Sequence, residues 1–148
     1  MTDLYYMEQA RLQALIALRR GESPVGCVIV RDGKIIAWGY NRRNTEKNPL
    51  AHSEIIAINQ ACGVVGDWRL EECALYTTIE PCPMCAGAII QARIPRLIFG
   101  APNPKAGCAG SVLNLFAEPR FNHHVSVTGP VLEEPCAILM KEFFLSLR

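Results

Sequence analysis

Apolar residues follow two patterns along the chain, one typical of helices and the other typical of strands. Residues 3–20 place apolar side chains three and four positions apart, which predicts an amphipathic helix that ends near Gly21. Short β-branched runs at 25–31 and 34–41 flank an Asp-Gly pair, a strong signal for a β-hairpin. The chain is therefore predicted to begin with one helix followed by two antiparallel strands.

The rest of the sequence alternates between helical and extended patterns. The expected elements are a polar loop at 42–50, a helix at 51–62, a loop at 63–72, a strand at 73–79, a helix at 82–92, a strand at 96–101, a Pro- and Gly-rich loop at 101–111, a short strand within 122–129 and a helix at 134–147. This order predicts an α/β fold with three layers, α/β/α, around a mixed five-stranded sheet that is antiparallel at one end and parallel beyond. No repeat or linker interrupts the pattern, so we expect one domain over residues 1–148.

The composition is that of an ordinary globular protein. Half of the 148 residues are hydrophobic and 20% are charged, which excludes a disordered, collagen-like or coiled-coil chain. No apolar run approaches the roughly 18 residues of a membrane span, and the N-terminus lacks the apolar block of a signal peptide. We therefore expect a cytoplasmic protein without membrane association. In that reducing compartment, seven cysteines favour metal binding or buried thiols over disulfides.

The charges are unevenly distributed, although the net charge is only +1. Residues 19–47 hold seven lysines and arginines against three acids, and residues 82–122 hold four against Glu118 alone. Brought together, these segments would form a basic face suited to a polyanion. The alternative is that they are ordinary solvated charges.

Two short motifs carry the candidate chemistry, and each stands at the predicted start of a helix. They are His52-Ser53-Glu54 and Pro81-Cys82-Pro83-Met84-Cys85. Cys82 and Cys85 are three positions apart, so both thiols face the same side of the first helical turn, where the helix dipole favours the thiolate. With His52 they make a three-ligand set that suits tetrahedral zinc with an open fourth position, as in catalytic zinc sites. We expect one zinc ion per chain, held by His52, Cys82 and Cys85.

Glu54 follows His52 at a spacing that places its carboxylate beside the open position instead of on the metal. It is the predicted catalytic residue, which takes a proton from the bound water and returns it to the leaving group. A lone C-x-x-C would also fit a redox pair or half of a zinc ribbon. However, the sequence has no second C-x-x-C, and a redox pair leaves His52 and Glu54 without a role. The joint pattern H-x-E…P-C-x-x-C is typical of zinc nucleobase deaminases, so the predicted reaction is hydrolytic deamination.

Beyond these motifs, the sequence resembles the bacterial tRNA adenosine deaminases over nearly its full length. The matching stretches are SPVGCVIV, GYNRR, PLAHSEIIA, TIEPCPMCAGAII, ARIPRLIFGAPNPKAGCAGS, FNHHVSVTG and KEFFLSLR. The resemblance implies a cytidine deaminase-like fold, a homodimer, and conversion of adenosine to inosine at the wobble position of tRNA. The expected partner is therefore a tRNA anticodon stem-loop.

Six further positions are candidate substrate contacts, namely Asn41, Ser53, Asn103, Lys105, Asn122 and His123. The resemblance implies that Asn41 contacts the flipped base, and that Asn122 and His123 lie close to the bound anticodon loop. Ser53, which replaces the usual alanine, would face the base edge with its backbone. Asn103 replaces the usual aspartate near the ribose and the RNA backbone, while Lys105 is a candidate phosphate contact or a solvated lysine.

Two other functions stay open at this point. The C-P-M-C motif equally fits a deaminase of a free nucleobase or nucleoside, such as guanine, although the basic segments favour a polyanion. A catalytically idle subunit of a deaminase complex is the third possibility. Such subunits tend to lose the glutamate, whereas Glu54 is present.

Overall fold

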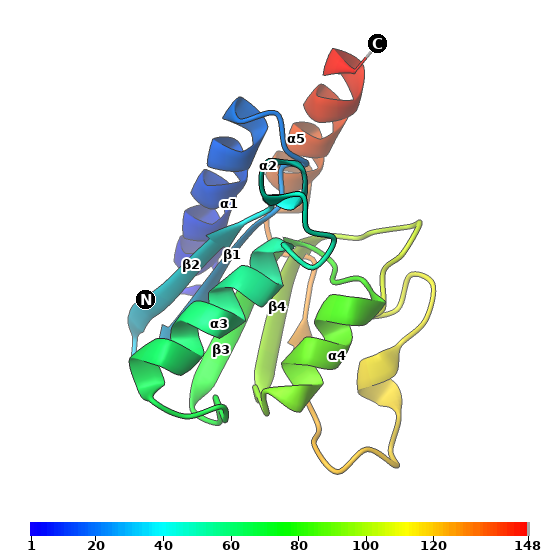
Figure 1. Cartoon of the computed structure of the whole chain (residues 1–148). Coiled ribbons are helices and arrows are strands. Elements are labelled where there is room, and N and C mark those ends of the chain that lie inside the picture. Colours follow the sequence, from blue (N-terminus) through cyan, green and yellow to red (C-terminus); the bar gives the residue numbers. More distant parts are fainter. Residues whose placement is uncertain (148) are drawn as a thin grey trace.

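A mixed five-stranded sheet forms the centre of the computed structural model, which describes residues 1–147 (Figure 1). Its strands are β1 (Gly26–Arg31), β2 (Lys34–Tyr40), β3 (Cys73–Ile79), β4 (Arg96–Ala101) and β5 (Ser126–Thr128), in the spatial order β2-β1-β3-β4-β5. β1 runs antiparallel to both β2 and β3, whereas β3, β4 and β5 are parallel. The predicted sheet, antiparallel at one end and parallel beyond, is confirmed.

Helices cover both faces of this sheet (Figure 1). They are α1 (Asp3–Arg19) and α5 (Glu133–Ser146) on one face, and α3 (Ser53–Val65) and α4 (Pro83–Gln91) on the other. Alternate strand residues enter the two cores, since Ile29 packs toward α3 and α4 while Val28 packs toward α1 and α5. The predicted α/β/α layering is therefore confirmed. Among residues 1–147, no helix combines the length and the apolar character needed to cross a membrane.

Two predicted boundaries need correction. The expected loop at 42–50 contains a one-turn helix, α2 (Arg43–Glu46), because the carboxylate of Glu22 accepts hydrogen bonds from the N–H groups of Asn44 (3.1 Å) and Thr45 (2.6 Å). These are donors that the start of a helix leaves unpaired. α3 continues past residue 62 to Val65, and Gly66 ends it with a φ of 77°. The first correction depends on a contact distant in sequence, which local patterns do not reveal.

A glycine on β2 allows α3 to approach the sheet closely. A Cβ added to Gly39 would lie 2.2 Å from the carbonyl oxygen of Ser53 and 3.1 Å from the backbone nitrogen of Ala57. A side chain at this position would push the first turn of α3 away from β2. Gly39 therefore helps to set the position of the residues at the start of α3.

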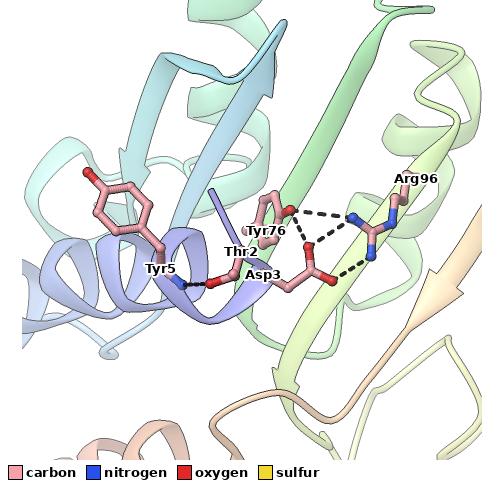
Figure 2. A network of polar contacts seen from close by, with 5 residues as sticks. All are labelled: Thr2, Asp3, Tyr5, Tyr76 and Arg96. Atoms are coloured by element: carbon pink, nitrogen blue, oxygen red, sulfur yellow. Dashed lines mark hydrogen bonds and ion pairs between the residues drawn. The ribbon is translucent and has the colours of Figure 1, made fainter.

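A polar network ties the start of α1 to the sheet (Figure 2). Arg96 at the start of β4 donates to both carboxylate oxygens of Asp3, with a distance of 2.9 Å to Oδ1, and the Tyr76 hydroxyl donates to Oδ1 at 2.6 Å. Thr2 caps the helix by accepting from the N–H of Tyr5. The contact with the Arg96 guanidinium holds the pKa of Asp3 below its usual range. The network joins the N-terminal helix to β3 and β4.

Replacing Asp3 with Asn should lower the free energy of unfolding by about 1–2 kcal/mol at pH 7, because it removes charge-assisted hydrogen bonds that are partly exposed to solvent. The lowered pKa of Asp3 means that its contribution is complete above the unfolded-state pKa, roughly 4, and is lost as the pH falls through the folded-state value. Urea denaturation of both proteins between pH 7 and pH 3 measures this difference. A difference that stays constant down to the lowest pH at which the fold persists would contradict the assignment.

Candidate metal and substrate site

The starts of α3 and α4 bring one histidine and two cysteines together. His52 precedes the first residue of α3, Cys82 precedes the first residue of α4, and Cys85 lies in the first turn of α4. Nδ1 of His52 lies 3.6 Å from Sγ of Cys82 and 3.6 Å from Sγ of Cys85. All three ligand atoms are within 4.8 Å of one another. The predicted juxtaposition of the two motifs is confirmed.

This donor set has the dimensions of a tetrahedral zinc site. Zn–N bonds of about 2.0–2.1 Å and Zn–S bonds of about 2.3 Å at a tetrahedral angle place nitrogen and sulfur about 3.6 Å apart. The hydrogen bond from the Cys85 thiol, with a further one from His52, lowers the pKa of Cys82 to about 4 and so favours its thiolate. The same contact raises the pKa of Cys85, and the contact with Cys82 raises that of His52. Residues and spacing therefore fit zinc, which binds thiolate sulfur and imidazole nitrogen.

A cavity of about 320 Å³ opens beside the three residues. Its walls come from the ends of β2 and β3, the starts of α3 and α4, the loop after β4, and α5. The lining residues are Ser23, Val25, Asn41, Arg43, His52, Ser53, Glu54, Ile79, Glu80, Cys82, Pro102, Asn103, Pro104, Lys105, Met140 and Phe144. Four of the six predicted substrate contacts are thus brought to one cavity with the metal motifs.

Glu54 is buried in the cavity wall, with only 4% of its surface exposed. Burial raises the pKa of its carboxyl group, and a single side-chain donor, the Ser53 hydroxyl, offsets part of this effect by donating to Oε1 at 2.6 Å. A carboxyl group with a raised pKa next to a metal site can both accept and return a proton near neutral pH. The carboxyl group of Glu54 therefore lies in the same cavity as the candidate metal ligands, with a raised pKa.

A second buried carboxylate holds the loop after β4, and the sequence patterns did not reveal it. Glu80 accepts from the N–H groups of Asn103 (3.0 Å), Ala109 (2.8 Å) and Ser111 (3.1 Å), and from the Ser111 hydroxyl. Burial alone would raise the pKa of Glu80, but the combined hydrogen bonds hold it below its usual value. The sequence shows only an acidic residue between an apolar strand and Pro81. The hydrogen-bond partners of Glu80 lie more than 20 positions away, so no local pattern indicates them.

The last helix contributes an unexpected wall of the cavity. Met140 and Phe144 of α5 line it, and Nζ of Lys105 lies 5.8 Å from the centre of the Phe144 ring. Phe144 is 52% exposed, so the packing of the helix leaves about half of its surface uncovered. The two residues come from the far end of the chain, and the packing of α5 against β4, β3 and α1 brings them here.

Asn122 and His123 lie outside this cavity. Nε2 of His123 contacts the carbonyl oxygen of Ile94 at 2.8 Å, and Asn122 lines a separate hollow beside α4. Both residues precede β5, which begins alongside the start of β4, whereas the cavity lies where β3 and β4 end. Within one chain, these two residues therefore lie apart from Asn41 and the cavity, and their contact with RNA stays a prediction.

The predicted basic face forms only in part. Of the arginines in the two basic segments, Arg31, Arg42, Arg96 and Arg120 pair with acidic side chains. Arg93 stacks near Trp68 and lines the hollow beside α4 instead of the cavity. Arg43 and Lys105 are the arginine and the lysine among the residues that line the cavity, so part of the predicted positive charge lies beside the metal motifs.

Comparisons with known proteins agree with this geometry. Residues 1–101 match a family described as the cytidine and deoxycytidylate deaminase zinc-binding region. The chain is 47% identical over 146 residues to the tRNA-specific adenosine deaminase of Bacillus subtilis (strain 168), covering 99% of this chain and 91% of that protein.

Two solved structures place the fold in the same group. One comes from studies of A-to-I editing by tRNA:A34 deaminases at the wobble position of transfer RNA, with a TM-score of 0.88, 41% identity, and coverage of 91% of this chain and 98% of that chain. The other is a guanine deaminase from Bacillus subtilis, with a TM-score of 0.69, 34% identity, and coverage of 96% of this chain and 94% of that chain. The chain therefore belongs to the cytidine and deoxycytidylate deaminase zinc-binding family and, within it, to the tRNA-specific adenosine deaminases.

Proposed function

We propose that the protein hydrolytically deaminates adenosine to inosine at the wobble position of tRNA anticodons. The observation that carries this proposal is that the His52, Cys82 and Cys85 cluster and the buried Glu54 lie at one cavity of about 320 Å³, which an unpaired base can enter. The tRNA deaminase relatives supply the substrate class. An anticodon loop already presents unstacked bases, so a base can be turned into the cavity at low cost.

We propose one zinc ion per chain, held by His52, Cys82 and Cys85. When bound, zinc lowers the pKa of a water at its open position and so supplies a nucleophile at neutral pH. Glu54 would accept a proton from the attacking water and return it to the leaving amino group of the adenine, which departs as ammonia. Ser53 keeps the Glu54 carboxylate in place through its hydroxyl.

The remaining cavity residues divide between the base and the RNA backbone. Asn41 is 6% exposed, and its side-chain amide offers both a donor and an acceptor to the base edge. The apolar side chains of Val25 and Ile79 line the same cavity and can pack against the base. Asn103 and Lys105 lie at the mouth, where we propose that they contact the ribose and a phosphate.

A free nucleobase such as guanine is the less supported alternative. The guanine deaminase structure is 34% identical to this chain, against 47% for the tRNA-specific adenosine deaminase. The two positively charged residues that line the cavity, Arg43 and Lys105, also favour a polyanion. An idle subunit is disfavoured because Glu54 is present and lines the cavity beside the candidate metal ligands.

We further propose that the chain forms a homodimer through the outer side of α4. This helix carries no charged residue, and the neighbouring segment exposes Val112 (53%), Leu113 (58%) and Phe121 (42%). Exposed apolar side chains that gather next to an uncharged helix fit a protein interface. Asn122 and His123 stay predicted RNA contacts, which would then act on RNA held across the dimer.

The proposed setting is a single deaminase domain, residues 1–148, in the cytoplasm. Helices from both ends of the chain, α1 and α5, pack on the same sheet face and against each other, which supports one folding unit. A tRNA substrate and a metal site that needs reduced cysteines support a reducing, cytoplasmic location without membrane association.

Deamination should depend on Glu54 and on an adenine at the wobble position. Anticodon stem-loops with A, G or C at that position are incubated with the protein, and inosine is read by nuclease digestion and chromatography. We expect inosine from the A loop only, and Glu54→Gln should lose at least about 10²-fold in rate while it keeps its zinc. Deamination of free guanine with no inosine from any loop would instead support the alternative. Wild-type rates in Glu54→Gln would mean that another group moves the proton.

Metal content should depend on the cysteines of α4 and not on cysteine in general. Cys82→Ala removes one of three ligands and should lose most of the zinc measured by mass spectrometry of the dialysed protein. The matched control is Cys62→Ala, a partly exposed cysteine of α3 outside the cluster, which should keep one zinc per chain. Equal zinc in both variants would remove Cys82 from the ligand set.

The dimer interface can be tested at Leu113. Leu113→Glu introduces a charge that would be desolvated in the interface, so the variant should be monomeric in sedimentation analysis at concentrations where the wild type is dimeric. Leu12→Glu is the control, an exposed leucine of α1 on the opposite sheet face. A Leu113→Glu protein that stays dimeric would place the interface elsewhere.

A further inference from the structure

Glu80 is buried like an active-site acid, but its bonding differs from that of Glu54. Only 2% of the residue is exposed, and none of the ion pairs formed within residues 1–147 includes it. Its negative charge is instead met by three backbone N–H groups and one hydroxyl, from Asn103, Ala109 and Ser111. Each carboxylate oxygen accepts two of these bonds. Because a carboxylate offers about four lone-pair positions, Glu80 is saturated and has none left to take a proton from substrate or water.

The backbone around Glu80 joins the same loop to the metal motif. The N–H of Glu80 donates to the carbonyl oxygen of Ala101 at 2.8 Å, and the carbonyl oxygen of Pro81 accepts from the N–H of Cys108 at 2.9 Å. Cys82 follows directly. The loop at 102–111 is thus closed around the two residues that precede a proposed zinc ligand.

The loop wraps the carboxylate so closely that it requires a glycine. A Cβ added to Gly107 would lie 2.4 Å from Cδ of Glu80 and 2.6 Å from the carbonyl oxygen of Asn103. That oxygen accepts from the N–H of Gly107 at 2.8 Å, which closes the turn on which Lys105 sits. The conformation of the turn and the position of the carboxylate therefore depend on each other.

We propose that Glu80 is a positioning residue, which sets where Asn103 and Lys105 stand at the cavity mouth relative to Cys82. This inference rests on the proposed function, since these two residues are the proposed contacts to ribose and phosphate. Glu80 contributes to holding the polynucleotide and takes no part in proton transfer. Its loss should therefore weaken binding of a stem-loop and leave the rate of the chemical step nearly unchanged.

The main test is Glu80→Gln, which keeps the shape of the side chain but turns an NH₂ group toward N–H donors. We expect full zinc content, a KM for the A-containing stem-loop raised about tenfold or more, and a single-turnover rate at saturation within about threefold of the wild type. Hydrogen exchange of the 103–111 amides should accelerate. Glu72→Gln, an exposed glutamate paired with Arg31, is the control and should change none of these values.

Two further variants keep the test open if Glu80→Gln does not fold. Ser111→Ala removes one donor and leaves the carboxylate with three, so its KM should rise by less than that of Glu80→Gln. Gly107→Ala keeps the charge of the carboxylate, but its Cβ would collide with the Glu80 side chain and with the carbonyl oxygen of Asn103. It should therefore separate the turn from the carboxylate and reproduce the KM effect of Glu80→Gln.

A lowered rate of the chemical step with unchanged binding would overturn the proposal. A saturated single-turnover rate as low as that of Glu54→Gln with an unchanged KM would make Glu80 part of the chemistry. Unchanged KM and unchanged exchange in all three variants would remove its positioning role. Failure of the wild type to deaminate any stem-loop would defeat the proposed function alone, because the exchange rates would still report whether Glu80 holds the loop.

Discussion

The site depends on strand direction. β2 and β3 both run antiparallel to β1, so they point the same way, and β4 is parallel to β3. All three strands therefore end at the same edge of the sheet. In α/β folds, ligands bind in a crevice at the carboxyl ends of the strands. The segments that follow them supply Asn41 and His52 after β2, Cys82 and Cys85 after β3, and the 102–111 loop after β4. Residues distant in sequence meet here because the sheet topology leaves them at the same edge.

Three buried glutamates near the cavity show how hydrogen bonding separates structural acids from a reactive one. A buried carboxylate is costly unless donors satisfy it. Glu22 and Glu80 are satisfied by backbone N–H groups and hydroxyls, and both have a lowered pKa. Glu22 stabilises the one-turn helix α2, and Glu80 stabilises the 102–111 loop. Glu54 has one side-chain donor and a raised pKa, which leaves it able to exchange a proton.

The parts of this account that sequence could predict are local ones. The H-x-E and C-x-x-C motifs each define the first turn of a helix, so spacing alone indicates which side chains share a face. The hairpin and the alternation of helices with strands predict the layers for the same reason. The roles of Glu22, Glu80, Met140 and Phe144 depend on contacts between segments far apart in the chain, which no local pattern encodes. The resemblance to the tRNA deaminases indicated Asn122 and His123 as RNA contacts. It did not indicate at which edge of the sheet a single chain places them.

The central claim is that two cysteines and one histidine hold a zinc ion whose fourth position stays available for water. X-ray absorption spectroscopy at the zinc edge of the purified protein tests it most directly, since sulfur and nitrogen or oxygen neighbours scatter at different distances. We expect two sulfur neighbours at about 2.3 Å and two nitrogen or oxygen neighbours at about 2.0–2.1 Å. Four sulfur neighbours, or a protein that deaminates stem-loops without bound zinc, would contradict it.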